Sequence, residues 1–130
     1  FLRYTSAGDV AWHRFAGATT GGMSLFASAM LADGSTLFTG SSSANADFEG
    51  SAGVSNLAKG ATGYLVRYTA SGDIAWLRGI AGRGLSALHV DESRQAVFAH
   101  GNGSDSLTFG VGDSDAVTEM VDGMFIARFN

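Results

Sequence analysis

Residues 65–76 read Leu65-Val66-Arg67-Tyr68-Thr69-Ala70-Ser71-Gly72-Asp73-Ile74-Ala75-Trp76, and the chain contains this stretch more than once. Near the start stands a similar run, Leu2-Arg3-Tyr4-Thr5-Ser6-Ala7-Gly8-Asp9-Val10-Ala11-Trp12. The last six residues match its opening and read Phe125-Ile126-Ala127-Arg128-Phe129-Asn130. Each copy contains an arginine near its start, and these arginines, at positions 3, 67 and 128, lie 64 and then 61 residues apart. Recurrence at this spacing predicts an architecture of repeated units.

The segments between these copies also correspond. Residues 28–33 resemble residues 86–91, residues 36–39 resemble residues 96–99, and residues 46–48 resemble residues 107–109. The same landmarks therefore recur in the same order, which supports a repeat of about 60 residues.

Each unit is predicted to contain four short β-strands. The sequence places those of the best-preserved unit at residues 23–32, 35–42, 64–69 and 74–79. Asp33-Gly34 marks a hairpin between the first two, because tight primed turns favour φ > 0 at both central positions. Ala70-Ser71-Gly72-Asp73 joins the last two, with Gly72 expected in a left-handed conformation. Residues 23–32 also fit a short helical stripe, but their counterpart at residues 85–91 is typical of a strand that is apolar on both faces.

Short four-stranded sheets that are apolar on both faces are typical of propeller blades, in which each blade packs between its neighbours. The expected fold is all-β, with four-stranded antiparallel, β-propeller-like blades and about two repeats. Residues 1–22 would supply the last two strands of one blade, residues 23–82 a complete blade, and residues 83–130 the first three strands of another. Since a propeller needs about four to eight blades, the chain is not self-closing. We expect it to be part of a longer polypeptide.

Composition excludes several classes of function. The 130 residues include 8 Lys and Arg against 12 Asp and Glu, for a net charge of −4, so no clustered basic face for nucleic acid is expected. There is no cysteine and therefore neither a disulfide nor a thiolate metal site. No window reaches the ~18 uninterrupted apolar residues of a membrane-spanning helix.

The unit resembles the bacterial β-propeller repeat of long secreted and cell-surface proteins. The resemblance rests on residues 33–41, on Ala46-Asp47-Phe48 and on residues 64–76, which follow that family's pattern of an Asp-Gly turn, an Asp-Phe loop and a strand pair ending in Trp. The second copy departs from it, because Glu92-Ser93-Arg94-Gln95 replaces the Asp-Gly turn and His100 stands where the first copy has Gly40. The resemblance implies an extracellular or cell-surface location. It transfers no catalytic residue.

Five residues mark structural repeat positions. Arg3, Arg67 and Arg128 either form a ring of cations that faces a ligand, or pack along a blade with their heads bonded to neighbouring carbonyls or to Asp9 and Asp73; recurrence in every unit favours the second interpretation. Trp12 and Trp76 are expected to be aromatic plates between blades.

The candidate contact surface is the set of connections at residues 41–62 and 101–122, which are predicted to be exposed loops. Phe48, Asp47, Asp113 and Asp115 are the candidate contact residues there. The acidic residues at 113, 115, 119 and 122 suggest Ca²⁺, but Val117 interrupts the oxygen series, so a solvated acidic loop is favoured. His13, His89 and His100 lack the close spacing of paired metal ligands, and no nucleophile elbow is present. No metal or cofactor is expected.

The sequence thus predicts a non-catalytic structural and interaction module. Its expected partners are further blades of the same protein, other copies of the chain, or a protein ligand. The alternative is a carbohydrate-binding propeller assembled from short chains, in which Trp12, Trp76 or Phe48 stacks on sugars.

Overall fold

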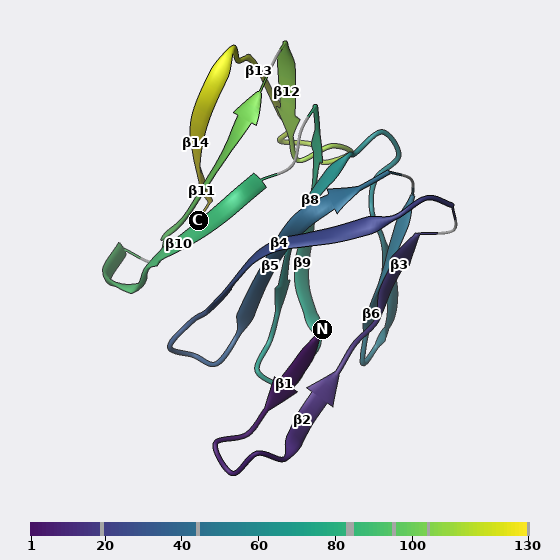
Figure 1. Cartoon of the computed structure of the whole chain (residues 1–130), viewed down its shortest axis with the longest axis vertical. Helices are drawn as coiled ribbons and strands as arrows, with labels where there is room; N and C mark the ends of the chain where they lie inside the picture. The colour runs from purple at the N-terminus through teal and green to yellow at the C-terminus, as the bar shows by residue number, and fades with distance from the viewer. Residues whose placement is uncertain (19, 44, 83–84, 95, 104, 130) are drawn as a thin grey trace.

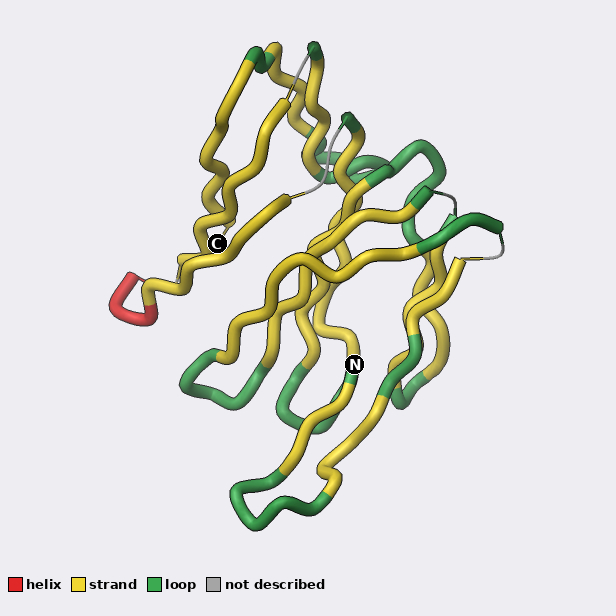
Figure 2. The backbone as a smooth tube through the Cα atoms, viewed as in Figure 1, coloured by secondary structure: helices red, strands yellow, loops and turns green. Residues whose placement is uncertain are grey.

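The computed structural model describes residues 1–18, 20–43, 45–82, 85–94, 96–103 and 105–129. In these residues the chain is organised as several antiparallel sheets, none of them closed (Figure 1). Apart from strands and turns, the described part contains a single 3-10 turn at Glu92–Arg94 (Figure 2). The predicted all-β, non-closing fold is confirmed at this level. The helical alternative for residues 23–32 is wrong, because Met23–Met30 forms a strand.

A four-stranded meander, called the central sheet below, organises the molecule. Its strands pair in the order β4-β5-β8-β9 and lie within two residues of the predicted positions: β4 (Met23–Met30), β5 (Thr36–Ser42), β8 (Gly63–Tyr68) and β9 (Ile74–Ala81). The Asp33-Gly34 turn joins the first two, with Gly34 at φ 79°. The backbones of β4 and β5 approach so closely at Gly40 that an added Cβ would lie 1.8 Å from the Ser24 carbonyl oxygen. Only glycine fits there.

Hydrogen bonding extends this sheet beyond the four strands that the sequence predicts. β12 (Ser106–Phe109) pairs with Ile80 and Ala81 at the end of β9, and β13 (Val117–Met120) pairs with β12. The result is a six-stranded sheet in the order β13-β12-β9-β8-β5-β4.

Three smaller sheets flank the central sheet. The N-terminal sheet is the hairpin of β1 (Leu2–Tyr4) and β2 (Val10–His13). The C-terminal sheet contains β10 (Leu85–Asp91), β11 (Ala96–Gly103) and β14 (Gly123–Phe129). A third sheet has the order β3-β6-β7 and contains β3 (Ala16–Ala18), β6 (Ala46–Gly50) and β7 (Gly53–Asn56). Figure 1 shows the C-terminal sheet on one side of the central strands and β1, β2, β3 and β6 on the other.

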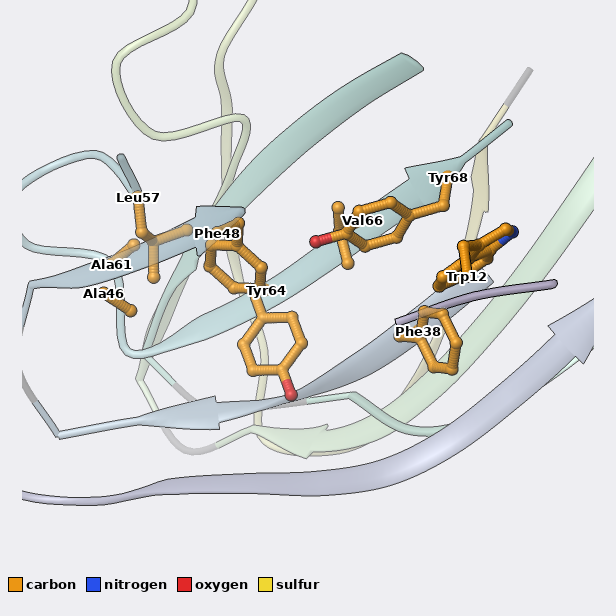
Figure 3. Packing of buried hydrophobic residues seen from close by; sticks show 9 residues of the cluster. All are labelled: Trp12, Phe38, Ala46, Phe48, Leu57, Ala61, Tyr64, Val66 and Tyr68. Atoms are coloured by element: carbon orange, nitrogen blue, oxygen red, sulfur yellow. The ribbon is translucent and has the colours of Figure 1, made fainter. Parts of the chain in front are cut away.

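The middle strands of the central sheet, β5 and β8, are buried on both faces because their apolar side chains alternate between two cores. The edge strand β4 instead exposes Leu25, Phe26 and Met30. The first core lies toward the N-terminal sheet and is drawn in Figure 3; the second lies toward the C-terminal sheet. On β8, Leu65 enters the second core and Val66 the first, and neither side chain is exposed to solvent. This pattern is that of a strand covered on both sides.

The prediction of loops at residues 41–62 and 101–122 is wrong for much of both segments, whereas the prediction of exposure is confirmed for β13 and most of β7. The first contains β6 and β7, the second contains the end of β11 with β12 and β13. Phe48, Leu57 and Leu107 are all at most 3% exposed. The physical reason is that buried backbone groups need partners, which β3 and β9 supply through the hairpins β6–β7 and β12–β13.

Candidate functional site

The turn between β8 and β9 is the point where two sheets meet. Thr69 donates its N–H to the Asp73 carbonyl at 2.8 Å, and Gly72 donates to the Thr69 carbonyl at 3.0 Å. Gly72 has φ 84°, as the turn requires. With these bonds in place, the carbonyls of Ala70 and Gly72 accept hydrogen bonds from side chains of the N-terminal segment.

Three side chains of the N-terminal segment hold this turn. Arg3 donates through Nη1 to the Gly34 and Ala70 carbonyls, the latter at 3.0 Å. Trp12 donates its indole N–H to the Ala70 carbonyl at 3.1 Å. Arg14 donates through Nε to the Gly72 carbonyl at 2.8 Å. All three donors thus recognise main-chain oxygens of the central sheet, and we call this contact the N-terminal seam.

Aromatic packing covers the N-terminal seam on the core side. Trp12 is 6% exposed, and its ring stacks on Tyr68 with 5.5 Å between centroids. Figure 3 shows Trp12, Phe38 and Tyr68 together at one end of the first core. The Tyr68 hydroxyl donates to the Glu49 carbonyl at 3.0 Å, which ties β6 to the same core. Burial raises the pKa of Tyr68 to about 12.

Arg67 occupies on β8 the position that Arg3 occupies on β1, but it bonds within its own sheet. Its Nη2 lies 2.7 Å from Asp33 Oδ2, and its Nε donates to Ser35 Oγ at 3.0 Å. Hydrogen bonds from the Ser35 hydroxyl and backbone N–H, together with Arg67, hold the pKa of Asp33 below its ordinary value. The expected partner Asp73 is not used in this way.

Trp76 occupies the position that corresponds to Trp12, and its surroundings are open. It is half-buried and lines two cavities, one of about 450 Å³ and one of about 350 Å³. The larger cavity lies beside the hairpin tips of the central and C-terminal sheets, where Arg67 and Glu92 line it. The smaller is lined by Arg78 and Asp113. Phe129 borders both, and we call these neighbouring hollows the Trp76 groove.

The acidic connection near residue 113 closes one side of the Trp76 groove. Arg78 Nη1 lies 2.5 Å from Asp113 Oδ2 and 3.8 Å from Asp115 Oδ1. Asp113 is therefore an ion-pair partner of β9 as well as a residue of the predicted contact surface. Asp115 remains largely exposed, with 75% of its side chain accessible.

The other two candidate contact residues lie on β6, and Phe48 is not available for contact. Its ring is fully buried and packs edge-on against Tyr64 with 5.0 Å between centroids, so the prediction for Phe48 is wrong. It fills the space between the central sheet and β6, as Figure 3 shows. Asp47 is half-buried and accepts a hydrogen bond from the Asn56 amide on β7.

Arg128, the third recurring arginine, lies at the surface on β14. Its side chain is exposed and makes no hydrogen bond or ion pair with the part of the chain that the structure describes. Arg14 and Arg78 were missed by the sequence analysis. Their signal was present, because they also lie 64 residues apart, two positions after each Trp.

Among the described residues, no three His, Asp or Glu side chains come together as a metal site. His13 packs against Phe15 and lies apart from His89 and His100, which are on β10 and β11. No helix in the described ranges has the length and apolar character needed to cross a bilayer.

Comparison with known proteins returns no relative. No family model matches the chain, no curated protein matches it, and no solved structure matches its fold.

Proposed function

We propose that the chain is a non-catalytic structural and interaction module, a β-propeller segment of a longer bacterial protein that is secreted or displayed at the cell surface. Residues 1–22, 23–82 and 83–130 are then the end of one blade, a complete blade and the beginning of another. The module works by packing against further blades, and the hairpins β6–β7 and β12–β13 contact a protein partner.

One observation carries this proposal: β5 and β8 of the central sheet are buried on both faces between neighbouring sheets, while the outermost sheets each leave one face open. Leu2 and Tyr4 on β1 are 49% and 57% exposed, and Met124 and Ile126 on β14 are 77% and 75% exposed. Apolar sheet faces of this kind are where a further sheet packs. The resemblance of the turn and strand sequences to the bacterial propeller repeat supports the assignment of the blades and the location.

The contact hairpins are supported by their exposed apolar side chains. Val54 on β7 is 61% exposed, and Val117 and Met120 on β13 are 51% and 79% exposed. They stand beside the charged residues Glu49 and Glu119, the mixture expected of a polar-rimmed contact surface.

Tandem chains test the proposed module. Two copies of residues 1–130, joined by a flexible linker, should unfold at a higher temperature than one copy, because the linked sheets cover each other's open faces. The control is the same linked chain with Ile126→Glu in its first copy and Tyr4→Glu in its second, the residues on the two faces to be joined. Equal melting temperatures for the single and the linked wild-type chains would contradict the proposal.

A carbohydrate-binding propeller is the second candidate, and the accessibility of Trp76 favours it. The half-buried indole borders both hollows of the Trp76 groove beside Arg78 and Asp113. An aromatic plate beside charged hydrogen-bonding groups suits a sugar ring. Trp12 and Phe48 are buried and would not take part.

A glycan array separates this second function from the first. Binding that is lost in Trp76→Ala, with the far-ultraviolet circular dichroism spectrum retained, would support sugar recognition. Asp47→Ala, on β6, serves as the control because Asp47 does not line the groove. A silent array for the wild-type chain would leave no support for this function.

A further inference from the structure

The N-terminal seam shows how an arginine of one sheet bonds to a turn of the next sheet, and the chain contains the parts of a second contact of this kind. At this seam an arginine on the third strand of one unit, Arg3, bonds to the carbonyl of Ala70 in the β8–β9 turn of the next unit. The recognised group is a main-chain oxygen in a glycine turn. Any turn with the same backbone geometry offers the same acceptor.

A second turn of this geometry lies between β1 and β2, in the N-terminal sheet. In the β1–β2 turn Thr5 donates to the Asp9 carbonyl at 2.8 Å and Gly8 donates to the Thr5 carbonyl at 3.0 Å, the same distances as in the β8–β9 turn. Gly8 has φ 91° against 84° for Gly72. Ser6 corresponds to Ala70, and the turn from Thr5 to Asp9 is exposed throughout.

Of the three recurring arginines, Arg128 is the one without a hydrogen-bond acceptor among the described residues. It aligns with Arg3 and Arg67, and its strand β14 alternates between the second core and solvent. Phe125 and Phe129 pack against that core, whereas Met124, Ile126 and Arg128 are exposed on the other face. On β11, Phe98 pairs directly with Arg128 and His100 with Ile126, so they share this outer face.

The opposite end of the molecule presents a matching apolar face. On β1, Leu2 and Tyr4 point away from the first core while Arg3 points toward the central sheet. Val10 pairs directly with Tyr4 and is 54% exposed, so it lies on the same outer face. Together these two outer faces are the two halves of the type of contact that the chain already makes internally.

We propose that two molecules of the chain associate head to tail, with the outer face of the C-terminal sheet of one packed on the outer face of the N-terminal sheet of the other. Arg128 of the first molecule then donates to the Ser6 carbonyl in the β1–β2 turn of the second, as Arg3 donates to Ala70. Ile126 and Met124 pack against Leu2, Tyr4 and Val10. This inference rests on the proposed function, since the second molecule takes the place of the further blade that packs on each open sheet face.

Such a contact is heterologous, because different surfaces of the two molecules meet. In a dimer, one molecule still has a free outer face on its N-terminal sheet and the other has a free outer face on its C-terminal sheet. Association therefore continues beyond a dimer. This property distinguishes it from a symmetric contact between two C-terminal sheets.

Sedimentation velocity on two surface variants tests the geometry. Ile126→Glu places a charge on the outer face of the C-terminal sheet, and Tyr4→Glu places one on the outer face of the N-terminal sheet. Each variant alone is expected to be monomeric at concentrations where the wild-type chain forms dimers and larger species. Their equimolar mixture is expected to form dimers and nothing larger, because only one productive pair of faces remains. Met30→Glu, which changes a residue of β4 that is 65% exposed, is the matched control and should associate like the wild type.

Arg128→Ala tests the arginine contact itself. Loss of a charged hydrogen bond should raise the dissociation constant by about tenfold or more. A monomeric wild-type chain would overturn the inference, as would self-association of Tyr4→Glu alone or an unchanged dissociation constant in Arg128→Ala. If the linked chains gain stability while separate chains stay monomeric, this inference fails and the proposed function stands.

Discussion

Gly72 has little freedom to change, since both its backbone and its surroundings require glycine. Its φ of 84° is unfavourable for residues with a Cβ, and a Cβ there would lie 2.9 Å from the Trp12 ring. Gly8 has a similar φ of 91° but no heavy atom within 4 Å of an added Cβ. The two glycines therefore separate backbone strain from side-chain collision.

We expect Gly72→Val to lower the free energy of unfolding by more than Gly8→Val. Backbone strain alone costs about 1–3 kcal/mol at either position, and collision with Trp12 adds to the cost at Gly72. Urea denaturation of both variants at low protein concentration measures the difference. Equal free energies of unfolding would show that Trp12 yields without cost.

Two buried tyrosines make stability depend on alkaline pH. Burial raises the pKa of Tyr64 to about 12 and that of Tyr68 to about 12. In the unfolded chain a tyrosine has a pKa of about 10. The folded state therefore favours the protonated form, and this contribution is complete below pH ~10 and lost as the pH rises toward 12.

The free energy of unfolding is accordingly expected to fall between about pH 10 and pH 12. Tyr68→Phe should weaken this dependence while costing about 1 kcal/mol at neutral pH, because the Glu49 carbonyl loses its donor. Tyr4→Phe is the control, since Tyr4 is 57% exposed and no buried hydroxyl is removed. A pH profile identical in Tyr68→Phe and the wild type would contradict the assignment to Tyr68.

At the scale of the elements, β5 and β8 are the best-protected strands. Each is hydrogen-bonded to a neighbour on both edges, and their side chains enter both cores. Among the described strands β13 bonds only to β12, and all four of its residues are exposed. Burial and edge pairing therefore differ sharply within one continuous sheet.

Amide hydrogen exchange followed by mass spectrometry should reveal this gradient. We expect the slowest exchange in peptides covering β5 and β8 and much faster exchange in β13, because local opening of an edge strand breaks few contacts. Comparable protection of β13 and β8 would mean that the hairpin β12–β13 is held by more than its pairing with β9.

The central strands were predictable from the sequence, and the hairpins β6–β7 and β12–β13 were not. Asp33-Gly34 and the flanking apolar residues identify β4 and β5 locally. Residues 46–56 are rich in Ser, Gly and Ala, so their strand state depends on pairing with β3. Ala46 and Phe48, two positions apart, were the available sign of a buried face. The pairing of Arg78 with Asp113 had no local sign, because the two residues meet only through the fold.

For the whole molecule, the central sheet links the two cores into one cooperative structure. Adjacent residues of β5 serve different cores, Phe38 the first and Leu37 the second. Disruption of either core also exposes one face of the shared sheet. Unfolding of one half should thus carry the other with it.

We expect Phe38→Ala and Leu37→Ala each to lower the stability of a single unfolding transition by about 2–5 kcal/mol. Tryptophan fluorescence and circular dichroism should report the same denaturation midpoint in each variant. Ser41→Ala, on the same strand and outside both cores, serves as the control. Two separated transitions would show that the cores unfold independently.

The choice of main-chain oxygens as acceptors for Arg3, Trp12 and Arg14 has an evolutionary consequence. Every residue type supplies a main-chain carbonyl. Substitution at position 70 therefore keeps the hydrogen bonds from Arg3 and Trp12, provided that the turn keeps its backbone conformation. Selection then acts on the backbone geometry through Gly72, and the residue types at the neighbouring turn positions 70 and 71 are free to vary. Replacement of one repeat unit by another during evolution would thereby preserve the hydrogen bonds between adjacent units.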